Sequence, residues 1–460
     1  MWDWFRTRRR YIAYLCLLCN AYTEMCARFG VSISMIGGMV KKDCDDPDDV
    51  GQFCWSQSTQ AMVIGAYFYG YVAQCFTTFV AKYFTGFTRT YRFWLILSGA
   101  IQFCYPTFAA LSPTIVIFTQ AIRGVVAGIM MSFSFHYISK FGIGKESKIF
   151  ISLVGATNYI GSGTGGVLAG FITDIFGWQY YFYYSGICYA IGLVLTLLFV
   201  QESPEKCWFM TLEEKDMIMK ENKPSLKSES HEPSSPTNKL SFCRLYLIAF
   251  SIYLLAYNIV IYGILSVMPF YLNEITGADP QLISYLNISL TLLIALCTIA
   301  FSYVVQILDT LCSWLVCRMM CTLIPMLSYI IFFIALSYHL SFIGATIILI
   351  STSIMASTLF GGSVFMINYE MDPKNSAVRM SIFNSVGQAA GFICPLLMAA
   401  ITTTDRDHPN YASVYRQKWS YFFYTVAGFA AAGCLVIMLA YILSPDEWVN
   451  KDRKICKETV

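Results

Sequence analysis

The chain alternates long apolar runs with short polar loops, and this pattern constrains the fold more than any other feature of the sequence. Twelve runs are each long enough to cross a bilayer as a helix of about twenty residues. Charged residues make up only 13% of the 460 residues, whereas roughly a quarter is usual in soluble domains. The sequence therefore predicts an all-α polytopic membrane protein. The predicted spans are 11–40, 58–82, 92–111, 114–137, 149–174, 179–201, 244–272, 280–306, 313–337, 341–367, 378–401 and 419–443.

One long polar segment divides these runs into two groups of six. Its stretch 228–237, Ser-Glu-Ser-His-Glu-Pro-Ser-Ser-Pro-Thr, is charged and interrupted by proline, which favours a flexible linker. The expected organisation therefore has two six-helix bundles joined by a linker and flanked by two short cytoplasmic ends. Its parts are a cytoplasmic N-terminus at 1–10, bundles at 11–201 and 244–443, a cytoplasmic linker at 202–243 and a cytoplasmic tail at 444–460.

The two groups of runs also share a pattern. In the fifth and eleventh runs an Asn is followed by spaced glycines, and the run after each opens with Trp and several aromatic residues. The shared positions are Asn158, Gly161 and Gly165 in the fifth run, and Asn384, Gly387 and Gly391 in the eleventh. Glycines at such spacing allow close helix packing, and duplicated halves are typical of secondary transporters. Chance similarity between aromatic-rich apolar segments is the alternative.

The distribution of basic residues predicts the orientation. The N-terminus, the loops around Lys82 and Lys140, and the C-terminal tail are basic, whereas the loop after the first run is acidic. The positive-inside rule then puts both termini in the cytoplasm. Cys44 and Cys54 share the acidic loop and are the cysteines that could form a disulfide, with the unpaired state equally open. The plasma membrane and an endolysosomal or vesicular membrane are both compatible with the sequence.

Three ionisable residues lie well inside the runs. Glu24 and Arg28 lie four apart and therefore on one helix face, and Arg123 lies in the fourth run. A charge at the centre of a bilayer costs about 2.5–3.5 kcal/mol even by low estimates. Such residues therefore form either an ion pair that joins helices or a site for substrate or protons.

Each of these charges has a possible role in transport. Arg28 and Arg123 are candidates for anion binding, because a guanidinium stays charged and can bind a carboxylate or phosphate with two hydrogen bonds. Burial favours the neutral form of a carboxyl group and a nearby Arg the charged form. We therefore interpret Glu24 as the proton-coupling residue, released from Arg28 by protonation or substrate. A purely structural Glu24–Arg28 pair is equally compatible.

Uncharged polar residues in the spans are weaker candidates, because they also hydrogen-bond between helices. Tyr71, Tyr262 and Asn384 are the predicted substrate contacts among them, in a set that also holds Tyr67, Gln74, Asn158, Asn368 and Gln388. Residues near the predicted span ends are expected to extend to the interface, namely Lys82, Asp174 and Arg318. Glu370 and Asp372 are expected in a loop at a cytoplasmic gate.

Several motifs together resemble one transporter family. They are Arg28 followed by 30–35, Ile64-Gly-Ala-Tyr-Phe-Tyr-Gly-Tyr71, Glu202-Ser-Pro204 before a Glu-Lys helix at 212–215, Met268-Pro-Phe-Tyr271, and Asp372-Pro373 with Asn384, Gly391 and Pro395. In this order they resemble the anion/cation symporters of the major facilitator superfamily, over residues 11–448. The resemblance implies a twelve-helix fold of two six-helix bundles that moves a small anion by alternating access, coupled to H+ or Na+.

The chain also departs from that family. Gln120 and Ala127 occupy the positions of the usual Arg and Glu in span 4, although Arg123 lies one turn along. Ile64 replaces the His and Tyr257 the Arg of the vesicular glutamate transporters. The specific substrate is therefore not implied. A uniporter or exchanger of a less charged solute, and a receptor that kept the fold without transport, are the alternatives.

Other function classes find no support in the sequence. The net charge of +3 and the absence of basic–aromatic clusters argue against nucleic-acid binding. No phosphate-binding loop or zinc spacing is present, so we expect neither an enzyme nor a cofactor or metal. The expected partners are a small anionic solute, H+ or Na+ and the lipid bilayer. The terminal residues 458–460 could also place Val460 in a PDZ-type groove.

Overall fold

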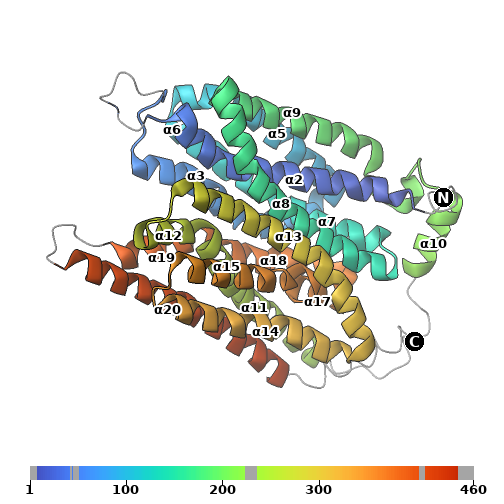
Figure 1. Ribbon diagram of the computed structural model, residues 1–460. Coiled ribbons are helices and arrows are strands. Elements are labelled where there is room, and N and C mark those ends of the chain that lie inside the picture. The colour runs from blue at the N-terminus through green and yellow to red at the C-terminus, as the bar shows by residue number, and fades with distance from the viewer. Residues whose placement is uncertain (1–7, 42–43, 45–50, 223–235, 404–409, 444–460) are drawn as a thin grey trace. The chain divides into compact units, whose positions relative to one another are not determined.

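The computed structural model describes residues 8–41, 44, 51–222, 236–403 and 410–443. These residues divide into two compact units, each consisting almost entirely of helices (Figure 1). Unit 1 contains the described residues up to 222 and the segment Asp372–Ser381, and unit 2 contains the others. The predicted contact at Val460, the C-terminal tail and most of the proline-rich linker lie outside the described residues.

Unit 1 begins with a helix that buries one face against its neighbours and leaves residues such as Leu15 exposed. Helix α2 lies along α8 and also contacts α9, α3 packs on α6, and α5 packs on α9 (Figure 1). The α-helices of this unit are α2 (Arg10–Ser34), α3 (Gln57–Tyr71), α4 (Gln74–Val80), α5 (Phe87–Leu111), α6 (Pro113–Ala127), α7 (Ile129–Phe141), α8 (Gly144–Phe176), α9 (Trp178–Phe199) and α10 (Leu212–Asn222). Shorter elements are the π-helices η1 (Met35–Met39) and η2 (Ala81–Thr85) and the 3-10 helices η3 (Pro204–Lys206) and η5 (Pro373–Asn375).

Unit 2 is built mainly around α20, which packs against both α11 and α14. Its helices are α11 (Pro236–Tyr262), the π-helix η4 (Gly263–Val267), α12 (Met268–Thr276), α13 (Pro280–Leu311), α14 (Trp314–Leu336), α15 (Phe342–Ala356), α16 (Thr358–Gly361), α17 (Val364–Met371), α18 (Ser376–Gln388), α19 (Ala390–Thr402) and α20 (Tyr411–Leu443). Helix α18 begins in the segment that groups with unit 1 and continues into unit 2.

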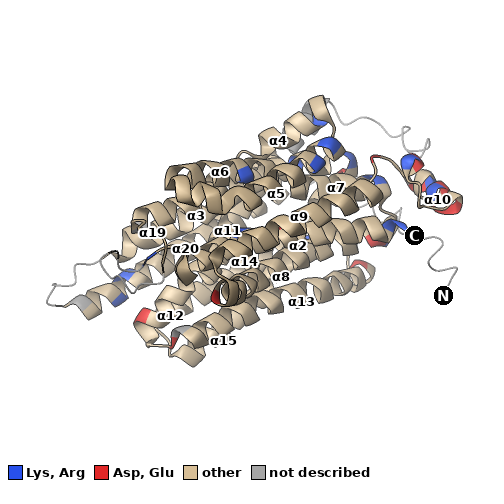
Figure 2. Cartoon of the chain, turned by 90° about the horizontal axis from the view of Figure 1, so that it is seen from above, with Lys and Arg blue, Asp and Glu red and all other residues tan. Residues whose placement is uncertain are grey.

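The helices meet the length and composition needed to cross a membrane. Among the described residues, nine pass a joint test of length, hydropathy and charge, and α3 with α4 forms a tenth span bent by 41°. Helices α2 and α8 have 25 and 33 residues, but polar residues in α2 and many Gly, Ser and Thr residues in α8 lower their hydropathy. Charged side chains gather mainly near helix ends (Figure 2).

Local sequence signals explain where several helices begin. The hydroxyl of Ser112 accepts a hydrogen bond from the Thr114 amide at the start of α6, with Pro113 in the first turn. Asp279 and Pro280 start α13 in the same way. Between α8 and α9, Gly177 adopts a φ of 100°, which favours glycine.

Glycines set the close packing of unit 1, as their spacing predicts. A methyl group added at Gly165 would lie 2.6 Å from the Cα of Cys26, so α8 can approach α2 closely only without a side chain there. Gly161 has the same role against Met25, where the added carbon would meet the Cβ at 2.7 Å. Gly124 of α6 faces the backbone of Tyr67 on α3. The close contact of α6 with α3 places both helices beside Glu24 of α2.

The loop after η1 is tied to the segment before α3. The amide of Lys41 donates to the carbonyl oxygen of Phe53 at 2.9 Å, and Cys44 and Cys54 form a disulfide. The structure thus resolves the pairing that the sequence left open.

Candidate functional site

Glu24, in the middle of α2, is a fully buried carboxylate of unit 1, as is Glu214 of α10. The Glu24 side chain has no exposed surface. The Nη2 of Arg123 on α6 donates to Glu24 Oε1 at 3.0 Å. The Tyr67 hydroxyl on α3 donates to the same oxygen at 2.8 Å, and the Tyr189 hydroxyl on α9 donates to Oε2. One carboxylate therefore joins α2, α3, α6 and α9, and both of its oxygens accept hydrogen bonds.

Arg123 is equally buried and has further acceptors. Its Nη1 donates to the side-chain oxygen of Gln120 at 3.2 Å and to the carbonyl oxygen of Ala27 at 3.4 Å. Its guanidinium also lies 5.3 Å from the centre of the Tyr67 ring. Gln120, one turn before Arg123 on α6, thus helps to orient the Arg123 guanidinium.

Arg28 lies one turn after Glu24 and is partly exposed. Its guanidinium carbon is 4.2 Å from the ring centre of Phe68, 4.8 Å from that of Tyr67 and 5.7 Å from that of Tyr71. Aromatic rings attract a cation without neutralising it. The three rings on α3 therefore position a second positive charge beside the Glu24–Arg123 pair.

The structure thus brings four predicted site residues into one cluster of unit 1: Glu24, Arg28, Arg123 and Tyr71. The sequence paired Glu24 with Arg28 on its own helix, whereas the ion pair observed for Glu24 joins it to Arg123. Tyr189 is a site residue that the sequence analysis missed.

The other two predicted site residues lie in unit 2 and are linked through Gln388. The Tyr262 hydroxyl on α11 donates to Gln388 Oε1 at 2.8 Å, and Gln388 Nε2 donates to Asn384 Oδ1 at 3.4 Å. All three belong to a hydrogen-bonded chain between α11 and α18.

Unit 2 also contains an ion-pair network that corrects one prediction. Arg318 was expected to extend to the membrane interface, but its side chain is fully buried. Its Nε and Nη2 donate to the two oxygens of Glu370 at 2.7 Å each, and Nη2 also contacts Asp309 at 3.1 Å. Trp314 Nε1 donates to Glu370 at 2.8 Å. Glu370, expected in a loop, belongs to helix α17.

Comparison with known proteins gives the family. The sequence profile of the Major Facilitator Superfamily matches residues 13–394. Sialin from Homo sapiens is 24% identical over 412 residues, covering 87% of this chain and 79% of sialin. Vesicular glutamate transporter 2 from Bos taurus is 24% identical over 391 residues, covering 82% of this chain and 63% of that protein.

A solved structure supports the same fold. The D-xylose-proton symporter superposes with a TM-score of 0.60 at 14% identity, covering 92% of this chain and 97% of the symporter. The predicted fold of twelve helices in two bundles is that of this superfamily, whose members are transporters rather than enzymes. The chain is a multi-pass membrane protein that belongs to the Major Facilitator Superfamily, as a divergent relative of its anion/cation symporters.

Proposed function

We propose that the protein is a secondary active transporter that moves a small organic or inorganic anion by alternating access, coupled to H+, with Na+ as the alternative ion. The observation that carries this proposal is the buried Glu24–Arg123 ion pair with Arg28 one helical turn away. Two guanidinium groups and one carboxylate leave this cluster with a net positive charge. An anionic solute would balance it.

The ion pair also provides a physical basis for coupling. Protonation of Glu24 would remove the negative partner of Arg123 and leave a buried guanidinium without a counter-charge, which is costly. An anion that binds Arg123 or Arg28 would restore the balance. Proton binding and anion binding would then favour each other, and such reciprocal coupling is what a symporter needs.

The remaining polar candidates would orient the solute. Tyr71 lies beside Arg28, and Tyr262 and Asn384 offer hydroxyl and amide groups in unit 2. The names of the relatives suggest which anions to try first, because one of them is a vesicular glutamate transporter. Glutamate and other small carboxylates are therefore the first substrates to test.

Uptake into proteoliposomes tests this function. Purified protein would be reconstituted and given labelled anions under an imposed pH or Na+ gradient. We expect gradient-driven uptake of at least one anion, loss of that uptake in Arg28→Gln, and uptake in Glu24→Gln that no longer responds to the pH gradient. Lys220→Gln, a change at an exposed lysine of α10, is the matched control.

Each step of the proposal has a result that would exclude it. Uptake in Glu24→Gln that still follows the pH gradient would remove the proton role of Glu24. Uptake that ignores both gradients would indicate a uniporter or exchanger. If no anion is transported and none raises the thermal stability of the protein, a receptor-like relative fits better, because a ligand of the folded state must stabilise it.

A further inference from the structure

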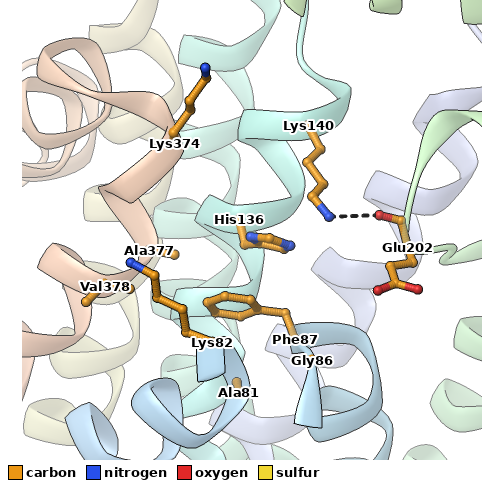
Figure 3. Close-up of a pocket in the computed structure, with 10 residues that line it drawn as sticks. All are labelled: Ala81, Lys82, Gly86, Phe87, His136, Lys140, Glu202, Lys374, Ala377 and Val378. Atoms are coloured by element: carbon orange, nitrogen blue, oxygen red, sulfur yellow. Dashed lines mark hydrogen bonds between the residues drawn. The ribbon is translucent and has the colours of Figure 1, made fainter. Parts of the chain in front are cut away.

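Unit 1 contains a second polar site, away from Glu24 and Arg123. It is a pocket of about 240 Å³ where the end of α7, the η2–α5 junction, the segment after α9 and the turn before α18 meet (Figure 3). Three lysines line it, Lys82, Lys140 and Lys374, together with His136 and Glu202. None of these residues belongs to the Glu24 cluster.

Two of the pocket lysines are held by hydrogen bonds to oxygen atoms. Lys140 Nζ donates to the backbone carbonyl oxygen of Glu202 at 3.1 Å, and Lys82 Nζ donates to the amide oxygen of Asn375 at 3.3 Å. Both acceptors are neutral oxygens. These two hydrogen bonds hold the ammonium groups in place, and the Glu202 carboxylate also attracts the Lys140 ammonium.

The one carboxylate in the pocket already has a partner of its own. Lys206 Nζ donates to Glu202 Oε2 at 3.2 Å, and this hydrogen bond and charge lower the pKa of Glu202. Lys206, outside the pocket, and Lys140, inside it, thus both act on the negative charge of Glu202. The pocket therefore has an excess of positive charge from its three lysines.

Two stacked rings form part of the pocket lining. The His136 ring stacks on Phe87, with ring centres 4.0 Å apart and an angle of 15° between the planes. Lys140 extends toward His136, whereas the Lys82 ammonium points toward Ala377 and the Lys374 ammonium points away from the ring (Figure 3). Lys374 is exposed, and its flexible side chain can turn toward a bound anion.

We propose that this pocket binds a phosphate group, at a site separate from the Glu24 cluster. Lysine ammonium groups bind phosphate as point charges, and the His136 ring can add a donor. The volume lies below the roughly 300–1,000 Å³ of pockets for drug-sized ligands. It therefore suits a small headgroup or a free ion rather than a large organic molecule.

A neighbouring surface favours a lipid as the source of the phosphate. Tyr83 and Phe84, directly after Lys82, are 61% and 76% exposed. Aromatic side chains beside basic residues are typical of membrane interfaces, where they contact lipid while the lysines bind anionic headgroups. A phosphorylated inositol lipid would use both features, and inorganic phosphate only the lysines.

Direct binding to the purified full chain tests the proposal, with inorganic phosphate and a short-chain phosphatidylinositol phosphate as the two probes. We expect the lipid to bind more tightly, each change of Lys82, Lys140 or Lys374 to Gln to weaken binding about fivefold, and added salt to weaken it further. Lys145→Gln and Lys220→Gln, at exposed lysines outside the pocket, should bind like the parent.

The possible outcomes distinguish a lipid headgroup from free phosphate, and both from the absence of a phosphate site. Equal, lysine-dependent binding of both probes would assign the site to free phosphate. Binding that is unchanged in the triple Lys→Gln variant, or absent in the parent, would overturn the proposal. The three single variants keep the test valid if the triple variant does not fold, and none of these results bears on Glu24 or on anion transport.

Discussion

At the scale of single residues, the buried Glu24–Arg123 pair has a large energetic consequence. Removing one partner leaves the other charge buried without compensation, which costs about 3–5 kcal/mol. We therefore expect Glu24→Gln and Arg123→Gln each to lower the unfolding free energy by that amount. The double variant should lose much less than the sum, because neither charge is then stranded.

Thermal unfolding of the purified variants measures this coupling. The control is Glu202→Gln, which breaks an ion pair whose side chains are 57% and 65% exposed. Exposed pairs contribute about 0–1 kcal/mol, so the control should unfold close to the parent. Strictly additive losses in the double variant would show that Glu24 and Arg123 do not act as a pair.

At the scale of elements, the α2–α8 contact depends on the absence of a side chain at Gly165. An added Cβ there meets the Cα of Cys26 at 2.6 Å, and a backbone atom cannot turn aside. We expect Gly165→Ala to cost about 1–3 kcal/mol, the usual range for overpacking. At the next residue, Gly166, the nearest atom to an added Cβ is Ile33 Cγ1 at 3.5 Å, an ordinary contact. Gly166→Ala should unfold like the parent, and equal losses in both variants would contradict this packing.

The turn between α17 and α18 depends on one carboxylate. Burial raises the pKa of Asp372, but hydrogen bonds from Asn375 and Arg379 outweigh burial and leave this pKa below its usual value. A lowered pKa in the folded state means that ionised Asp372 stabilises the fold at neutral pH. This contribution is lost as the pH falls below about 4, through the usual and then the lowered pKa.

The comparison of Asp372→Asn with the parent tests whether ionised Asp372 stabilises the fold at neutral pH. The carboxylate is 39% exposed, so solvent screening limits the expected loss at pH 7 to about 1 kcal/mol. Thermal unfolding across a pH series should show the two proteins converging in acid. A gap that stays constant down to acidic pH would exclude ionised Asp372 as the cause.

At the scale of the whole molecule, the sequence predicts the helices and their closest contacts better than the partners of individual side chains. Run lengths predict the spans, and the spacing of Gly161 and Gly165 predicts the contact that α8 makes with α2. Charges as rare as Glu24 and Arg28 in an apolar run indicate one candidate site. These inferences need only local sequence, because helix length and helix faces follow from residue order.

Side-chain partners depend instead on how distant helices rotate against each other. Tyr189 donates to a residue 165 positions earlier, and nothing distinguishes it among 31 tyrosines. Arg318 lies near a predicted span end, but Glu370, 52 positions later, holds it in the interior. Neither partner is encoded in a local pattern.

The orientation of the whole molecule is predicted by two independent features. Basic residues in alternate loops put both termini in the cytoplasm. The Cys44–Cys54 disulfide puts the loop after η1 on the other side, because disulfides persist in oxidising compartments.

With this loop outside, a membrane-impermeant maleimide applied to intact cells should label it only after reduction. For a protein in vesicle membranes, the same label should act only from the lumen. A Cys44→Ser/Cys54→Ser variant should lose this reduction-dependent signal. If the loop is instead labelled from the cytoplasmic side, the predicted orientation is wrong and every span runs in the opposite direction.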